Sequence, residues 1–137
     1  MDSVASLAGV TLDCPHPQAL AEFYQRMGGG EIVYSSDAFV YLAVGGFGLG
    51  FQRDPEYQAP SWPDPATPQQ AHVDFRTSEL DRAEAAAVSA GAQRPAQQPY
   101  PDAWRVLLDP AGHPFCFSTY GTSVGPDAQR PGSGVYG

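Results

Sequence analysis

The chain has 137 residues, of which 42% are hydrophobic, and a formal net charge of −8 at pH 7. This hydrophobic fraction is enough for a packed interior, which excludes a disordered chain. Only seven residues are Lys or Arg, and no apolar stretch reaches the roughly 18 residues of a membrane-spanning helix, so we expect a cytoplasmic protein that binds neither nucleic acid nor membrane.

The first part of the chain predicts one strand, one helix and three further strands. Residues 10–14 alternate apolar and polar side chains, as a half-buried strand does. Pro17 suits the first turn of a helix, and the apolar stripe that follows it stops at the glycines 28–30. Two-residue turn signals then separate three short strands, expected at residues 31–35, 38–44 and 47–53.

Residues 54–70 are rich in proline and have no periodicity, and we interpret them as an ordered crossover or lid. A strand over residues 71–76 and a helix over 79–90 follow. Thr77 or Ser78 is expected to cap this helix, and Asp81 stands three residues after Ser78, as in a capping box. The remaining expectations are an edge or loop at 95–99, strands at 104–108 and 114–119, and a flexible tail over 121–137.

The second part of the chain resembles the first. When the sequence is shifted by 63 positions, the segment from Gly9 lies over the segment from His72, and a shift of 66 places Gly46 over Gly112. We interpret the chain as two copies of one βαβββ unit, with chance similarity in a chain rich in Gly and Ala as the alternative. The predicted organisation is a module over residues 1–53, the crossover over 54–70, a second module over 71–120 and the tail over 121–137.

Three segments resemble the vicinal oxygen chelate superfamily, also called the glyoxalase/bleomycin-resistance/dioxygenase superfamily. They are the segment from Leu-Asp-Cys-Pro through Glu-Phe-Tyr-Gln-Arg-Met-Gly-Gly, the segment Ala-His-Val-Asp-Phe, and the segment Leu-Leu-Asp-Pro-Ala-Gly-His-Pro-Phe-Cys-Phe. The resemblance implies an α+β fold in which two βαβββ modules form a cupped, partly open mixed β-sheet barrel with helices packed outside. It leaves the activity open, because the superfamily holds both enzymes and binding proteins.

The resemblance also implies where a metal would lie. Metal enzymes of this family carry ligands on the inner face of the first, fourth, fifth and eighth strands, and the internal offsets place these four positions at Gly9, Gly50, His72 and Cys116. Glycine offers no donor, and zinc sites usually have three or four protein ligands. We therefore expect no cofactor. The alternative is a divalent metal held by His72 and Cys116 with waters or residues of a partner chain.

His72 is the main candidate functional residue. As a lone histidine on a strand beside a cavity, it is a hydrogen-bonded wall residue, a ligand-contacting donor or general base, or a metal ligand. Asp13, Asp74 and Arg76 share its face by strand parity; they either orient His72 or form an ion pair that satisfies buried charge. Asp13 is the second candidate general base. Cys116 is expected to be an inert wall residue, because an acidic chain does not favour a thiolate.

Aromatic residues are expected to surround the space that the glycines leave. An apolar, aromatic cleft with a few polar groups is how small-molecule sites are generally built. The aromatic residues assigned to this lining are Phe39, Tyr41, Tyr57, Trp62 and Trp104.

These features predict a metal-free protein that holds a hydrophobic or aromatic small molecule in a cavity between the modules, like the antibiotic-resistance members of the family. We expect it to be a homodimer. The alternative is a glyoxalase-like enzyme, whether lyase, isomerase or dioxygenase, which is metal-dependent or uses His72 or Asp13 as general base. An interaction domain without a ligand is the third hypothesis, and the vacant inner face disfavours it.

Overall fold

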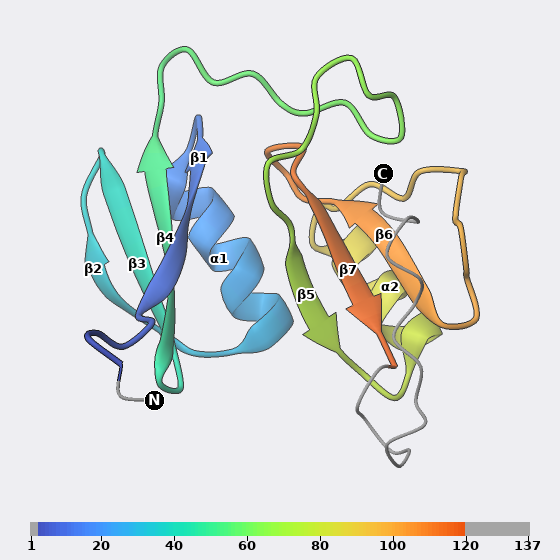
Figure 1. The fold of residues 1–137 in the computed structure, drawn as a ribbon, viewed down its shortest axis with the longest axis horizontal. Helices are drawn as coiled ribbons and strands as arrows, with labels where there is room; N and C mark the ends of the chain where they lie inside the picture. Colours follow the sequence, from blue (N-terminus) through green and yellow to red (C-terminus); the bar gives the residue numbers. More distant parts are fainter. Residues whose placement is uncertain (1–2, 120–137) are drawn as a thin grey trace. The chain divides into compact units, whose positions relative to one another are not determined.

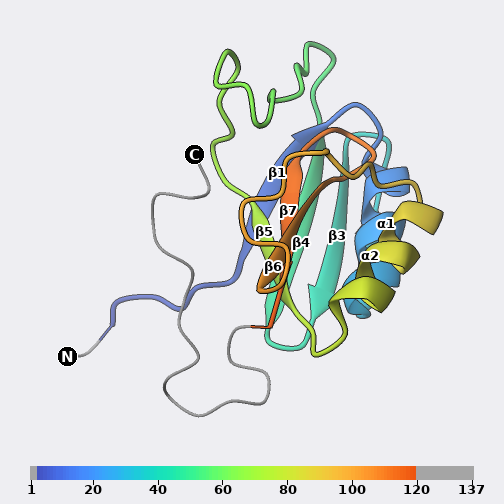
Figure 2. The same cartoon turned by 90° about the vertical axis from the view of Figure 1, so that its right-hand side faces the viewer.

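A computed structural model describes residues 3–119, which belong to two compact units that divide after residue 58 (Figure 1). This boundary falls within the predicted crossover, and the predicted tail over 121–137 lies outside the described residues. Each unit packs one helix against one face of a mixed sheet, which confirms the α+β class (Figure 2). The strands of residues 3–119 form one sheet of four and one of three, with no closed barrel. No helix in this range is long and apolar enough to cross a membrane.

The first unit is the predicted βαβββ module. Its elements are β1 (Gly9–Cys14), α1 (Pro17–Gly28), β2 (Glu31–Ser35), β3 (Phe39–Val44) and β4 (Phe47–Arg53). The sheet order is β1-β4-β3-β2, with β1 parallel to β4 and the other neighbours antiparallel. Alternate strand residues face α1, and Tyr24 of α1 stacks on Phe51 of β4 with ring centroids 5.6 Å apart. This buried layer holds the unit together and leaves the opposite face of the sheet for other roles.

The second unit has one strand fewer than the βαβββ repeat predicts. Its elements are β5 (Val73–Arg76), α2 (Leu80–Ser89), β6 (Trp104–Leu108) and β7 (Pro114–Ser118), in the sheet order β5-β7-β6. Where the first unit has β2, the second has a single bridge between Gln93 and Leu108. The expectation of a complete second βαβββ unit is therefore wrong by one strand.

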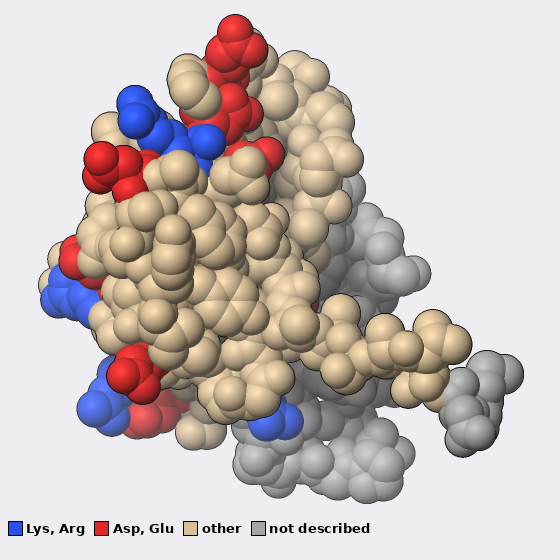
Figure 3. Space-filling view, turned by 90° about the vertical axis from the view of Figure 1, so that its left-hand side faces the viewer, with Lys and Arg blue, Asp and Glu red and all other residues tan. Residues whose placement is uncertain are grey.

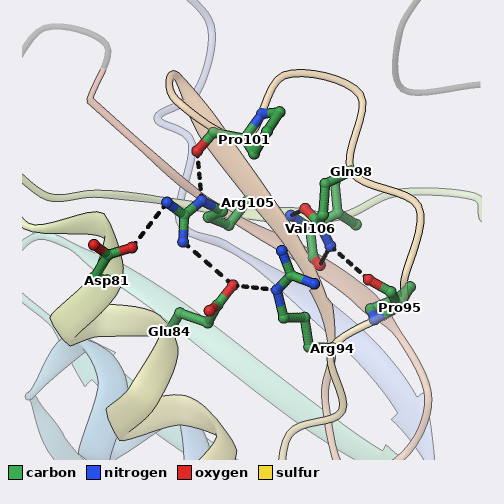
Figure 4. Close-up of polar contacts among 8 residues, drawn as sticks. All are labelled: Asp81, Glu84, Arg94, Pro95, Gln98, Pro101, Arg105 and Val106. Carbon is green, nitrogen blue, oxygen red and sulfur yellow. Dashed lines mark hydrogen bonds and ion pairs between the residues drawn. The ribbon is translucent and has the colours of Figure 1, made fainter.

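A side chain takes over part of the missing strand's role (Figure 4). The Oε1 atom of Gln98 accepts a hydrogen bond from the Val106 N–H at 2.9 Å, and its Nε2 donates to the Val106 carbonyl at 2.8 Å. The same Nε2 also donates to the Pro95 carbonyl at 3.0 Å. Proline has no N–H for a strand ladder, so the segment around Pro95 and Pro99 cannot pair as β2 does. The Gln98 amide instead satisfies the edge of β6.

The start of α2 also differs from the prediction. The N-cap residue is Glu79, whose side chain makes no capping hydrogen bond, so the expected capping box at Ser78 is wrong. The Thr77 hydroxyl accepts a hydrogen bond from the Glu79 N–H at 3.0 Å, just before the helix. The Asp81 carboxylate instead accepts a hydrogen bond from Arg105 of β6 at 2.9 Å, and Glu84 lies 3.4 Å from the same guanidinium (Figure 4). Burial disfavours the charge on Arg105, but the hydrogen bond and charge of Asp81 and the charge of Glu84 outweigh it and raise the pKa of Arg105. An ion-pair network therefore joins α2 to the sheet.

The strand registers confirm the internal repeat. Thr11 of β1 pairs with Gly50 of β4, and Asp74 of β5 pairs with Cys116 of β7. Position 74 is 63 residues after position 11, and position 116 is 66 residues after position 50, which are the two shifts seen in the sequence. Corresponding residues of the two units thus occupy corresponding places in the two sheets.

Candidate functional site

The face of the first sheet opposite α1 carries several of the predicted residues. We call it the aromatic face and define it by Thr11, Asp13, Tyr34, Phe39 and Tyr41 together with Gly48 and Gly50. Strand alternation places these residues on one side, because their neighbours Leu12, Val40 and Leu42 are buried under α1. Phe39 and Tyr41 are half-buried, and their rings are 28° from parallel with centroids 6.3 Å apart.

The two rings lie directly over glycines of β4. A Cβ atom added to Gly50 would lie 2.8 Å from Cζ of Phe39, and one added to Gly48 would overlap the Tyr41 ring. The expectation that these glycines leave open space is therefore wrong, since aromatic rings occupy it. The glycines instead allow a flat aromatic surface to form against the sheet.

The two glycines that the resemblance assigns to the family's metal centre are closely packed as well as lacking donors. A Cβ on Gly9 would collide with the backbone carbonyl of Gly48, and a side chain on Gly50 would meet Thr11 Oγ1 at 2.5 Å in addition to the Phe39 ring. Neither position could accept a ligating side chain without movement of its neighbours. The residues of this chain do not fit the four-ligand metal centre of the family.

In the second unit, the structure brings together three of the predicted residues. The Nε2 atom of His72 lies 3.3 Å from Oδ1 of Asp74, and potential donor atoms of His72, Asp74 and Cys116 all lie within 4.8 Å of one another. The side chains of His72 and Asp74 are 22% and 57% exposed, whereas Cys116 is buried. Sequence reasoning treated Asp74 only as an orienting residue or ion-pair partner. Its spacing of two residues from His72 on one strand was the signal for a third donor.

The two other predicted polar residues are Arg76 and Asp13. Arg76 is exposed two residues beyond Asp74 on β5. Asp13 is exposed on β1 in the first unit, so its predicted grouping with His72 stays a prediction.

Of the two predicted tryptophans, Trp104 lies in the core of the second unit and Trp62 packs against that core. Trp104 is 1% exposed and forms a buried cluster with Val106 and Cys116, against which Trp62 of the crossover packs. Its ring also lies 4.7 Å from that of Tyr100. Tyr57 is half-buried in the first unit. Trp62 thus gives the proline-rich crossover a partly buried anchor, and Cys116 belongs both to this core and to the donor group.

Sequence reasoning missed an open groove of about 890 Å³ in the first unit. It lies beside the start of α1, and none of its lining residues belongs to the aromatic face. Its ionisable lining residues are His16, Glu22, Asp37 and Arg53. Because the charges are of both signs, the groove favours no particular class of ligand.

The side of the first unit that carries β2 is largely uncharged. Figure 3 shows a broad surface without Lys, Arg, Asp or Glu at its centre and with such residues around its rim. Val33 and Tyr34 of β2 are 56% and 57% exposed. As an edge strand, β2 also leaves backbone groups without a strand neighbour on one side.

Comparisons with known proteins agree with this architecture. The family model of a glyoxalase-like domain matches residues 9–118. Among solved structures, the chain is similar to a glyoxalase/bleomycin resistance protein/dioxygenase family enzyme from Burkholderia phytofirmans PsJN, with 22% identity and a TM-score of 0.62. That match covers 82% of this chain and 97% of the other. A search of curated proteins finds no match by sequence.

Two fosfomycin resistance proteins named FosX are also similar in structure. The one from Mesorhizobium loti has 15% identity and a TM-score of 0.65, and the match covers 85% of this chain and 93% of the other. The one from Listeria monocytogenes, complexed with Mn(II) and sulfate, has 15% identity and a TM-score of 0.62, with 84% and 92% covered. At these identities the solved structures show the fold alone. Together with the family model over residues 9–118, they show that the chain belongs to the glyoxalase-like domain family of the vicinal oxygen chelate superfamily.

Proposed function

We propose that this protein binds a hydrophobic or aromatic small molecule on the aromatic face of its first module, without the four-ligand metal centre of the family's enzymes. The observation that carries the proposal is the position of the Phe39 and Tyr41 rings over Gly50 and Gly48. Flat aromatic rings offer stacking area to a planar ligand. Asp13 lies on the same face and supplies the kind of polar group that fixes a ligand's orientation.

The proposal is tested with Nile red, a neutral planar dye whose fluorescence rises in apolar surroundings. We expect the wild-type protein to bind the dye, and Phe39→Leu and Tyr41→Leu to weaken binding by about tenfold or more, since each removes a stacking ring. Phe47→Leu is the matched control, because strand parity places Phe47 on the opposite side of β4. Equal affinity of all four proteins would contradict the proposal.

The second candidate function is an enzyme of the same fold, favoured by the 3.3 Å contact between His72 and Asp74. A carboxylate beside an imidazole orients it for service as a general base. Because FosX structures share the fold, fosfomycin is a reasonable first substrate to test, with turnover followed by phosphorus NMR. Turnover that is lost in His72→Ala and reduced in Asp74→Asn would support this function. Dye binding without turnover of fosfomycin would favour the binding protein.

A further inference from the structure

We infer that the second module by itself binds a divalent ion of the zinc type through His72, Asp74 and Cys116. This site differs from the four-ligand centre of the family, whose donors come from both modules. Here all three donors come from the second module. His72 and Cys116 are two of the four positions that the resemblance assigns to the family's centre, and Asp74 is not among them. The inference does not depend on the aromatic face or on the proposed function.

The topology of the second sheet brings the three donors together. Asp74 and Cys116 are direct register partners on the neighbouring parallel strands β5 and β7, so their side chains point to the same face. His72 lies just before β5, and its Nε2 atom is 3.3 Å from Oδ1 of Asp74, so it reaches the same group. The strand pairing thus places Asp74 and Cys116 together, and the end of the crossover brings in His72.

The distances suit a tetrahedral ion after a small adjustment. Zinc lies about 2.0–2.3 Å from nitrogen, oxygen and sulfur ligands, so neighbouring ligand atoms are separated by roughly 3.3–3.7 Å. The 3.3 Å between His72 and Asp74 already has this value, and no separation in the group exceeds 4.8 Å. The remaining contraction of about 1 Å is within reach of side-chain rotation, since Asp74 is exposed and His72 is partly exposed.

The chemistry of the donors also suits zinc. Thiolate, imidazole and carboxylate are its usual protein ligands, and three of them leave a fourth position for water or a ligand. On binding, a metal–sulfur bond forms, and the Cys116 thiol releases its proton to solvent. The thiolate and the Asp74 carboxylate then balance the two positive charges of the ion. Cys116 lies against the apolar Trp104 cluster, while exposed Asp74 leaves the ion a path from solvent.

The test titrates the full, reduced chain with Co²⁺, which replaces zinc and reports a thiolate ligand by charge-transfer absorption in the near ultraviolet. We expect one cobalt ion per chain, the thiolate band, and loss of the band when Zn²⁺ is added. Cys116→Ala should abolish the band. Cys14→Ala is the matched control, because Cys14 is the other buried cysteine and lies in the first unit. His72→Ala and Asp74→Ala should each weaken cobalt binding by about tenfold or more.

Absence of a cobalt-dependent thiolate band in the wild-type protein would overturn the inference, as would a band that persists in folded Cys116→Ala. If Cys116→Ala does not fold, the cobalt affinities of His72→Ala and Asp74→Ala test the inference instead. Both residues lie outside the buried core, so we expect these two variants to fold. Unchanged cobalt affinity in those two variants would also overturn it. Nile red binding is measured on the same variants and is expected to stay at the wild-type level. A failure of the metal site and a failure of the proposed function are thereby distinguished.

Discussion

Glycines on β1 and β4 are matched to particular neighbours. Gly9 faces the backbone of Gly48, and Gly48 and Gly50 lie under the rings of Tyr41 and Phe39. A backbone neighbour cannot rotate away, whereas a ring can change its rotamer. Gly9 is therefore the position of the three at which a side chain is tolerated least.

We predict that Gly9→Ala lowers the free energy of unfolding by about 1–3 kcal/mol, because the added methyl group forces β1 away from β4. Gly46→Ala is the control, since a Cβ at that position has no atom within 4 Å and its backbone is not in the left-handed region. Its free energy of unfolding should be unchanged or raised by about 0.4–1 kcal/mol. Urea unfolding of both variants measures the difference, and equal stabilities would show that β1 can shift freely.

The sequence was informative about which residues share a face of a sheet, and less informative about which side chains contact one another. Strand parity predicted that Asp74 shares a face with His72, and the family resemblance, combined with the internal shift, implied that Cys116 lies on the same face. The folding of Phe39 and Tyr41 over the glycines depends on rotamers and on the room left by β4, which parity does not specify. The burial of Trp104 by Trp62 depends on the path of the crossover, and a segment without periodicity gives no sign of its path.

At the level of elements, the edge of β6 depends on one amide. Gln98 both donates to and accepts from Val106, as a residue of a neighbouring strand would. A carboxylate in its place could accept but not donate, and it would face the carbonyls of Val106 and Pro95.

We predict that Gln98→Glu lowers the free energy of unfolding by about 1–3 kcal/mol at pH 7, the typical effect of leaving partly buried polar groups without partners. The loss should diminish as the pH falls, because the protonated carboxyl regains a donor; its pKa would be raised by the carbonyls around it. Gln97→Glu adds the same charge to an exposed neighbouring residue and should leave stability within about 0.5 kcal/mol. Thermal unfolding across pH tests both variants. Equal losses of unfolding free energy in Gln98→Glu and Gln97→Glu would show that the added charge alone causes the effect.

Most helices and strands could be predicted from periodicity and turn residues. Three strands, β2, β4 and β6, have the predicted bounds. Residues 95–99, which stand where the repeat would have a strand, could be predicted only as an edge or loop. Their prolines indicate that strand pairing is interrupted there, but they do not indicate that a side chain takes its place. The start of α2 differs because Asp81 binds Arg105, which is 24 residues away. Local capping patterns cannot include such a distant partner.

For the whole molecule, the exposed β2 side bears on assembly. We predict a homodimer in which β2 is buried, because an edge strand with exposed Val33 and Tyr34 on a largely uncharged surface is one that soluble proteins usually cover. Val33→Lys should shift the molar mass in solution from two chains towards one, as measured by light scattering after gel filtration. Val88→Lys on α2 is the matched control, since Val88 is 46% exposed on another element. A monomeric wild-type protein would contradict the prediction.

The packing around Gly9 and Gly50 also limits how this molecule could change in evolution. To gain the family's four-ligand set, the chain would need donors at both positions, yet the first side chain to arrive would displace a strand or a ring. Each intermediate would be less stable than its parent and would lose part of the aromatic face. A path of single substitutions towards that ligand set thus first passes through less stable proteins, and the present arrangement is easier to keep than to leave.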